Sequence, residues 1–140
     1  SMDLKKMPRG VRNHNPGNIE KTADKWVGSD VKQTDSRFVT FSAPEFGIRA
    51  MARILQTYQT KHGLDTVEGI ISRWAPGSEN STEAYVNAVA MRTGYGRDLK
   101  IDISDDTVML RFIRAIITHE NGFQPYGDEV LEIGLALSKV

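Results

Sequence analysis

The apolar positions of residues 107–122 recur at spacings of three and four, which is typical of one buried face of a helix. The sequence here is TVMLRFIRAIITHENG, and the apolar face holds Val108, Met109, Phe112, Ile113, Ile116 and Ile117. Glu120 continues this series, four residues after Ile116. Gly122 predicts the end of the helix, because glycine readily takes the left-handed conformation that follows a helix C-terminus. The pattern therefore predicts a carboxylate at the border between core and surface.

Four further helices are predicted by the same spacing and by their expected caps. Ser42-Ala43-Pro44-Glu45 is typical of a capping box with proline in the first turn, and it predicts a helix to about Lys61. A short helix is predicted from Asp65 to Trp74, where Ala75-Pro76-Gly77 ends it. The other expected boundaries are a helix from about Thr82 to Arg92 that stops at Gly94, a last helix capped by Asp128, and a cap on the central helix from Ser104.

The first forty residues follow a different pattern. Residues 3–18 are rich in Gly, Pro and Asn, which predicts a structured loop that sustains no helix, with a tight turn at Asn15–Asn18. Short apolar pieces follow between Ile19 and Phe41, and they predict a hairpin of two or three strands. We expect one domain over residues 1–140, of class α+β and mostly α, with a helical body and a small β-hairpin lobe. Residues 1–8 are expected to be a tag remnant and a flexible N-terminus.

Composition and charge narrow the classes of function. The 140 residues contain 18 Lys plus Arg and 18 Asp plus Glu, so no net field attracts nucleic acid, and we expect no nucleic-acid partner. The chain has no cysteine, and its three histidines show no ligand spacing, so we expect neither a metal nor a cofactor. No apolar run approaches the roughly 20 residues of a membrane span, and no signal peptide is apparent. We expect a monomer that does not insert into membranes.

Glu120 is the first candidate for chemistry. A carboxyl group with one side against aliphatic residues loses hydration in its charged form, which favours the protonated form near neutral pH, as a general acid requires. The alternative is a glutamate that turns to water beside His119 and only forms surface hydrogen bonds. Glu45 is the second candidate, although the capping box already gives it a structural role.

A cleft between a helical body and a small lobe would suit an extended polymer, because a concave site buries more of a ligand than a flat one. Amides, hydroxyls and aromatic rings are the groups that suit a sugar. Each candidate also has a structural alternative as a turn former, a helix cap or a core residue. The candidate binding residues are Asn13, Asn15, Asn18, Trp26, Glu79, Asn80, Tyr85, Tyr95, Gln124 and Tyr126.

Several short motifs in one order resemble a group of phage virion and prophage proteins that are regarded as lysozyme-like peptidoglycan-degrading domains. The resemblance covers about residues 9–126. It is carried by Arg12–Ile19, Trp26-Val27-Gly28, Phe38–Phe41, Gly47–Ala50, Trp74-Ala75-Pro76, Glu79–Thr82, Tyr85 and His119-Glu120-Asn121-Gly122. The resemblance implies a lysozyme-like fold and cleavage of peptidoglycan glycan strands, in the virion or from the host cytoplasm with action on the periplasmic cell wall. Other virion proteins are then possible partners.

A weaker resemblance to bacterial cell-wall glucosaminidases bears on the roles of residues. In those enzymes a helix that ends in a catalytic glutamate precedes a hairpin with an Asn-Asn, Gly-Ile and Trp-Gly pattern. Here the similar hairpin series comes first, and Ala115–Gly122 resembles the acid-bearing helix at the other end, as in a circular permutation. The resemblance implies that Glu120 faces the hairpin lobe across a cleft. Glu45 and Glu20 stay open as alternative acids.

The implied reaction is cleavage of the β-1,4 bond between amino sugars, with no cofactor. A second carboxylate about 6.5–9.5 Å from the acid would activate water, and one at about 5–5.5 Å would act as a nucleophile. Without either, a hydroxyl of the substrate could attack and leave an anhydro sugar. The available hairpin acids are Glu20, Asp24, Asp30 and Asp35.

Two other hypotheses about function compete with the hypothesis of an enzyme. One is a noncatalytic module that binds the cell wall or builds the virion while it keeps a lysozyme-like fold. The other is a small nucleic-acid-binding domain, which is supported only by scattered arginines such as Arg9, Arg12, Arg49, Arg53, Arg111 and Arg114.

Overall fold

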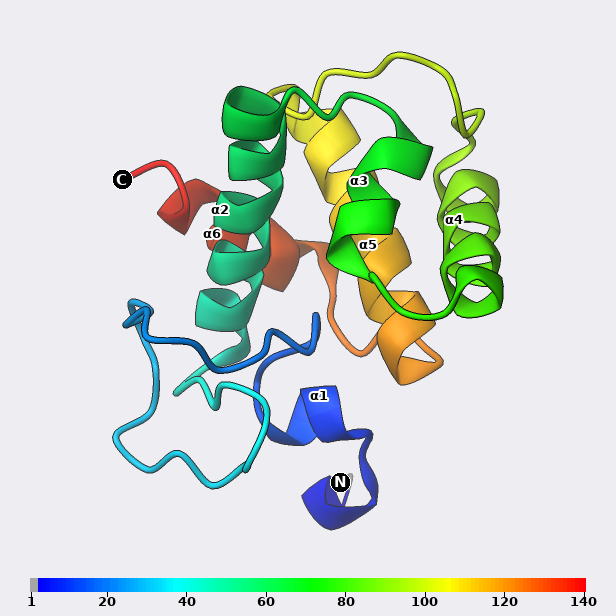
Figure 1. Ribbon diagram of the computed structural model, residues 1–140. Helices are drawn as coiled ribbons and strands as arrows, with labels where there is room; N and C mark the ends of the chain where they lie inside the picture. The colour runs from blue at the N-terminus through cyan, green and yellow to red at the C-terminus, as the bar shows by residue number, and fades with distance from the viewer. Residues whose placement is uncertain (1–2) are drawn as a thin grey trace.

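Helices make up most of the computed structural model, which describes residues 3–140 (Figure 1). The two residues before this range, part of the expected tag remnant, lie outside the described part. A short 3-10 helix, η1, covers Leu4–Lys6 of the segment that was expected to be flexible. The α-helices are α1 (Arg9–Arg12), α2 (Pro44–His62), α3 (Val67–Trp74), α4 (Glu79–Thr93), α5 (Asp106–Asn121) and α6 (Asp128–Leu137). The expected mostly helical fold is confirmed, but the prediction that residues 3–18 sustain no helix was wrong at α1.

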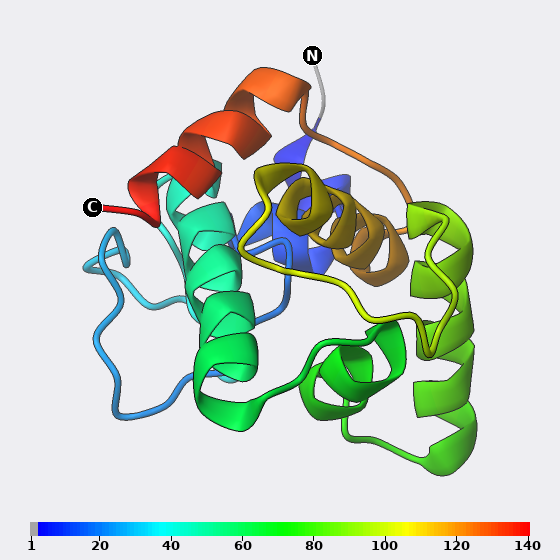
Figure 2. The ribbon, with the colours of Figure 1, turned by 90° about the horizontal axis from the view of Figure 1, so that it is seen from above.

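Helix α5 is the centre of the core. Its predicted apolar face is buried, with Phe112, Ile113, Ile116 and Ile117 each 0% exposed. It contacts α1, α2, α4 and α6, and Figure 2 shows α5 nearly end-on with α2, α4 and α6 around it. Gly122 follows in the left-handed conformation (φ 80°), so the predicted helix end is confirmed. Within residues 3–140 no helix is both long and apolar enough to cross a bilayer.

Several predicted helix starts were wrong by one to three residues. Ala43 is the N-cap of α2, so Glu45 falls at the second helical position, one short of the place that a capping box requires. The Ser42 hydroxyl instead donates to the Gly28 carbonyl at 3.0 Å. The observed N-caps of the other helices are Thr66 rather than Asp65, Ser78 ahead of an α4 that begins at Glu79, Asp105 rather than Ser104, and Gly127 rather than Asp128.

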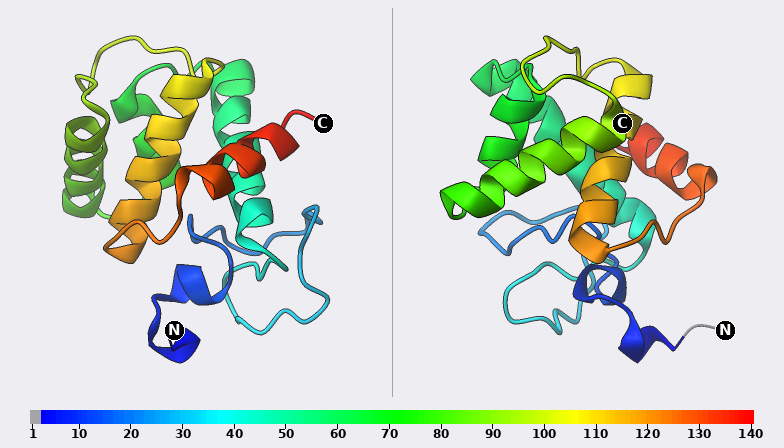
Figure 3. Two further views of the ribbon diagram at one scale, coloured as in Figure 1. Left: turned by 180° about the vertical axis from the view of Figure 1, so that it is seen from behind. Right: turned by 90° about the vertical axis from the view of Figure 1, so that its right-hand side faces the viewer.

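The N-terminal lobe, residues 9–41, packs beneath the ends of α2 and α5 (Figure 3). The expected hairpin is present only as two isolated antiparallel bridges in the described residues, Glu20 with Phe38 and Ser29 with Phe41. A buried side chain organises this region: the Asn15 amide donates to the carbonyls of Ile19 and Val39, both at 2.9 Å, and accepts from the Ile19 N–H. One asparagine thus supplies hydrogen bonds that a regular strand ladder would otherwise make.

Asp35 ties the two ends of the lobe together. It accepts two hydrogen bonds from Arg9 at 2.7 Å and one from Asn13 at 2.9 Å. The backbone N–H groups of Arg37 and Phe38 also donate to it, at 2.8 and 2.9 Å. The Arg9 guanidinium, helped by these donors, holds the pKa of Asp35 well below its usual range. Its ionised form is therefore part of the folded structure.

Replacement of Asp35 by Asn should change how stability depends on pH. The stabilisation from a depressed pKa is fully present above the ordinary aspartate pKa of 3.8. It is lost as the pH falls further, because the unfolded chain takes up the proton first. We expect Asp35→Asn to lower the melting temperature at pH 7 and to flatten its decline in acid, as followed by circular dichroism. Asp98→Asn, at an exposed aspartate, is the matched control. Parallel curves for wild type and Asp35→Asn would contradict the prediction.

Candidate functional site

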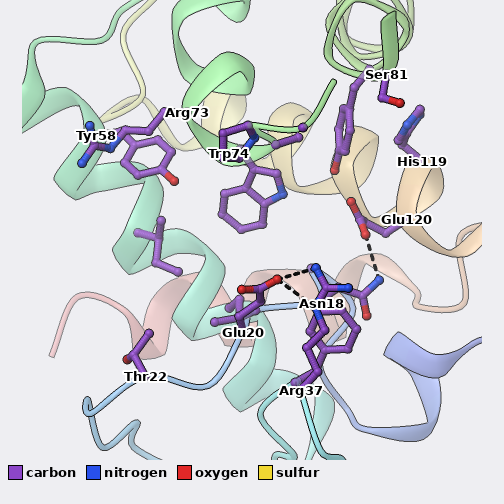
Figure 4. Close-up of a pocket in the computed structure, with 18 residues that line it drawn as sticks. Asn18, Glu20, Thr22, Arg37, Tyr58, Arg73, Trp74, Ser81, His119 and Glu120 are labelled. Carbon is purple, nitrogen blue, oxygen red and sulfur yellow. Dashed lines mark hydrogen bonds and ion pairs between the residues drawn. The ribbon is translucent and has the colours of Figure 1, made fainter. Parts of the chain in front are cut away.

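A cleft of about 860 Å³ lies between the N-terminal lobe and the helices (Figure 4). The lobe lines one side, and α2, α3, α4 and α5 line the other. The lining residues are Gly17, Asn18, Ile19, Glu20, Thr22, Arg37, Phe38, Ile54, Tyr58, Arg73, Trp74, Ala75, Pro76, Gly77, Ser81, Tyr85, His119 and Glu120. The cleft therefore joins segments from both ends of the chain.

Glu120 lies in the last turn of α5 and faces the lobe across this cleft (Figure 4). The Asn18 amide donates a hydrogen bond of 2.8 Å to Oε1 of Glu120, across 102 residues of sequence. Asn18 has a left-handed backbone (φ 51°), a conformation that asparagine adopts more readily than most residues. Its N–H donates to the Asn15 carbonyl at 3.0 Å, which closes the predicted turn. The turn thus aims the amide at the carboxyl group.

Asn121 fixes the end of α5 against the same turn. This buried side chain donates to the carbonyls of Pro16 and Ile117, both at 2.9 Å. Gly10 of α1 packs behind it, where a Cβ atom would lie 2.7 Å from Asn121 Oδ1 and 3.1 Å from Asn18 Oδ1. Only glycine fits this close approach without a shift of buried polar atoms. Asn121 and Asn18, with Gly10 packed behind them, therefore fix the position of Glu120 against the lobe.

Two aromatic side chains from α4 and α5 stand beside Glu120. The rings of Tyr85 and His119 pack with centroids 3.9 Å apart. Burial raises the pKa of Tyr85, and the negative charge of Glu120 adds to the rise, so the phenol stays neutral. Its hydroxyl is buried and has no hydrogen-bond partner among residues 3–140. Burial lowers the pKa of His119, and Glu120 opposes that shift.

Glu20 is the second carboxylate in the lining. It belongs to the lobe side, opposite Glu120 on α5 (Figure 4). Arg37 donates to its Oε1 from Nε at 2.8 Å and from Nη2 at 2.5 Å. This ion pair is largely exposed, with 63% of the Arg37 side chain and 57% of the Glu20 side chain accessible. Glu20 thus enters the cleft as one half of a neutral pair.

Of the predicted site residues, Asn18, Tyr85 and Glu120 come together in the cleft. Asn13 and Asn15 are buried structural residues of the lobe, which bond Asp35 and the Ile19 and Val39 backbone respectively. These two do not line the cleft.

Trp26 lines a separate hollow of about 210 Å³ within the lobe. Tyr95 stacks on Phe112 at 6.3 Å, away from the cleft. Glu79 and Asn80 are exposed in the first turn of α4 and lie outside the lining, although the next residue, Ser81, belongs to it.

Glu45, Gln124 and Tyr126 also lie outside the cleft. Burial raises the pKa of Tyr126 to about 12, and the nearby Glu45 adds to that shift. The side-chain Oε1 of Gln124 accepts a 3.3 Å hydrogen bond from the Tyr126 N–H in the connection after α5. The second candidate acid thus belongs to a different part of the surface from Glu120.

The predicted sites did not include the three basic residues of the cleft, Arg37, Arg73 and His119. Their sequence signals were weak, because isolated basic residues usually mark solvated surfaces. Within residues 3–140, no group of three or more His, Cys, Asp or Glu side chains is arranged to hold a metal ion.

Comparison with known proteins places the chain in a phage family. Protein P5 of Pseudoalteromonas phage PM2 is 45% identical over 129 residues, which cover 90% of this chain and 79% of the phage protein. The chain belongs to the P5 family. No protein-family model matches it. Membership of the P5 family agrees with the phage association expected from the sequence, and the relative's name carries no activity.

The site of this P5-family member can be tested through His119. The Glu120 carboxylate favours the charged imidazolium, so Glu120→Gln should lower the pKa of His119 still further. A pH titration of the histidine ring signals by NMR in both proteins would measure the change, with His14 and His62 as internal references. The same His119 titration in wild type and variant would contradict the placement of Glu120 beside this ring.

Proposed function

We propose that the protein is a glycosidase that cuts the β-1,4 glycan strands of peptidoglycan, with Glu120 as the general acid. The observation that carries the proposal is the position of Glu120 in the cleft, held by Asn18 from the opposite side. A polymer that lies between lobe and helices would pass directly over this carboxyl group. The phage family of the chain supports a substrate that a phage must breach.

The surroundings of Glu120 suit proton donation. Asn18 binds one carboxyl oxygen, which leaves the other for the glycosidic oxygen of the leaving sugar. The carboxyl group is partly buried beside Tyr85 and opens onto the cleft. As the C–O bond breaks, Glu120 would transfer its proton to the leaving oxygen.

Glu20 is the candidate for the second carboxylate. It lines the cleft opposite Glu120, so a sugar ring between them would meet a carboxylate on each side. In hydrolysis Glu20 would activate a water molecule or form the glycosyl intermediate. The Arg37 ion pair weakens both roles, because it stabilises the charge that a base or nucleophile uses. A nonhydrolytic attack by a substrate hydroxyl is therefore the competing route.

The rest of the lining suits neutral amino sugars. Trp74 and Tyr58 are partly buried and pack edge to face at 6.4 Å, with Trp74 beside the cleft floor at Gly17. Aromatic faces stack on sugar rings, while Asn18, Thr22 and Ser81 offer hydrogen-bonding groups. These features support the lysozyme-like interpretation, with the acid-bearing helix placed after the lobe in permuted order. The phage family supports action in the virion, or from the host cytoplasm on the periplasmic cell wall, and the proposal is for a monomer.

The alternative is a noncatalytic module that binds the cell wall or joins other virion proteins. The specific observation in its favour is the neutralised state of Glu20, which leaves a single free carboxylate in the cleft. Such a module would keep the sugar-binding surface but would not cleave the glycan strand.

Replacement of Glu120 by Gln separates the two functions. The change keeps the size of the side chain but removes the acid, so clearing of purified peptidoglycan should slow by about 10²–10⁴-fold while binding to the sacculi persists. Glu45→Gln is the matched control outside the cleft and should clear at the wild-type rate. Equal clearing by wild type and Glu120→Gln would rule out Glu120 as the acid. Binding without clearing by the wild-type protein would favour the noncatalytic module.

Mass spectrometry of the released fragments distinguishes the two routes. If Glu20 assists hydrolysis, the wild-type protein releases reducing ends, and Glu20→Gln should lower their yield by at least about tenfold. If the substrate hydroxyl attacks, the products carry anhydro ends and Glu20→Gln keeps that product type. Anhydro products from the wild-type protein would exclude Glu20 as the base.

A further inference from the structure

The cleft contains four charged side chains, and two of them cancel. Glu20 and Arg37 form an ion pair at 2.5 Å on the lobe side. The remaining charges are Glu120 on α5 and Arg73 on α3, and Figure 4 shows Trp74 between them. The cleft therefore has a free negative charge towards one end and a free positive charge towards the other.

Arg73 is exposed and forms no ion pair or side-chain hydrogen bond within residues 3–140. Its guanidinium carbon lies 5.5 Å from the centre of the Tyr58 ring, which packs against α3. A cation over an aromatic face is attracted to it, so the ring orients the guanidinium without using its N–H donors. These donors stay available for a ligand in the cleft.

We propose that Arg73 forms a subsite for a carboxylate carried by the glycan strand, on the side of Trp74 away from Glu120. The inference rests on the proposed function, because it assigns part of the substrate to the same cleft. The N-acetylated sugar rings of peptidoglycan are neutral. The carboxylates of a peptidoglycan strand belong either to the lactyl ether of muramic acid, once its peptide is removed, or to the stem peptide. A planar guanidinium binds a carboxylate with two parallel hydrogen bonds.

Arg37 does not offer the same subsite. Its Nε and Nη2 groups already donate to Glu20, and its guanidinium carbon lies 4.9 Å from the centre of the Phe38 ring. A carboxylate at Arg37 would have to displace Glu20 first. Arg73 binds one without breaking an existing ion pair, so the acidic group should lie at the α3 end of the cleft.

The subsite predicts a preference among three tetrasaccharides of similar length. The first alternates N-acetylglucosamine and N-acetylmuramic acid with stem peptides attached, the second is the same sugar after amidase treatment, and the third is neutral chitotetraose. Binding should be measured by calorimetry in the Glu120→Gln background, so that no ligand is cleaved. We expect at least one acidic ligand to bind about five- to tenfold more tightly than chitotetraose, with a preference that weakens as salt is added. The acidic ligand that binds better identifies the source of the carboxylate.

Arg73→Gln in the same background should remove this preference while the affinity for chitotetraose stays within about twofold, since only the charged contact is lost. Arg12→Gln is the matched control, because it removes the same charge from an exposed arginine outside the cleft, and it should keep the preference. Equal affinity of the Glu120→Gln protein for all three ligands overturns the subsite, as does an equal loss for all three in Arg73→Gln. If Glu120→Gln still abolishes clearing, either result leaves the proposed function intact. A protein that neither binds any of the three ligands nor clears peptidoglycan overturns both proposals.

Discussion

The hydrogen bonds between the end of α5 and the turn at Asn15–Asn18 hold the two sides of the cleft together. Asn121 binds the Pro16 carbonyl, and Asn18 binds Glu120 from the other side. The Asn121 contact is buried and the Asn18 contact is partly buried, and an amide that loses its partner away from water is costly. The buried apolar face of α5 fixes the helix in the core, and these amides set the distance between the helix end and the lobe. The proposed chemistry depends on that distance.

The lobe reaches its shape with little regular structure. A hairpin would normally hold a segment of this length through a ladder of backbone bonds, but here only two isolated bridges form. The side chains of Asn15 and Asp35 take over much of that role, because each forms hydrogen bonds with several backbone groups of the lobe. Side-chain anchors of this kind leave the backbone free to curve, which suits a lobe that must follow one side of a cleft.

Local patterns in the sequence predicted the features that depend on neighbours along the chain. The spacing of Phe112, Ile113 and Ile116 gave the buried face of α5, and Gly122 gave its end, because both follow from helix geometry alone. The helix caps were less reliable, since Ser42 has a competing acceptor in the Gly28 carbonyl. That acceptor comes from another segment, so the local pattern could not anticipate it.

The site was predicted only in part for the same reason. Three asparagines in the N-terminal segment looked equivalent, yet Asn13 and Asn15 serve the lobe and Asn18 alone meets Glu120. The difference arises from a contact across 102 residues, which no local pattern contains. Arg73 was passed over because its place beside Tyr58 depends on the packing of α3 against α2.

The order of segments has a consequence for how the protein is made. The ribosome releases the lobe, including Asn18, long before it reaches the glutamate that Asn18 holds. A nascent chain that ends before Glu120 lacks the acid that faces the lobe across the cleft. The lobe can therefore complete the site only after the ribosome has released the end of α5, and a shorter chain contains no complete site.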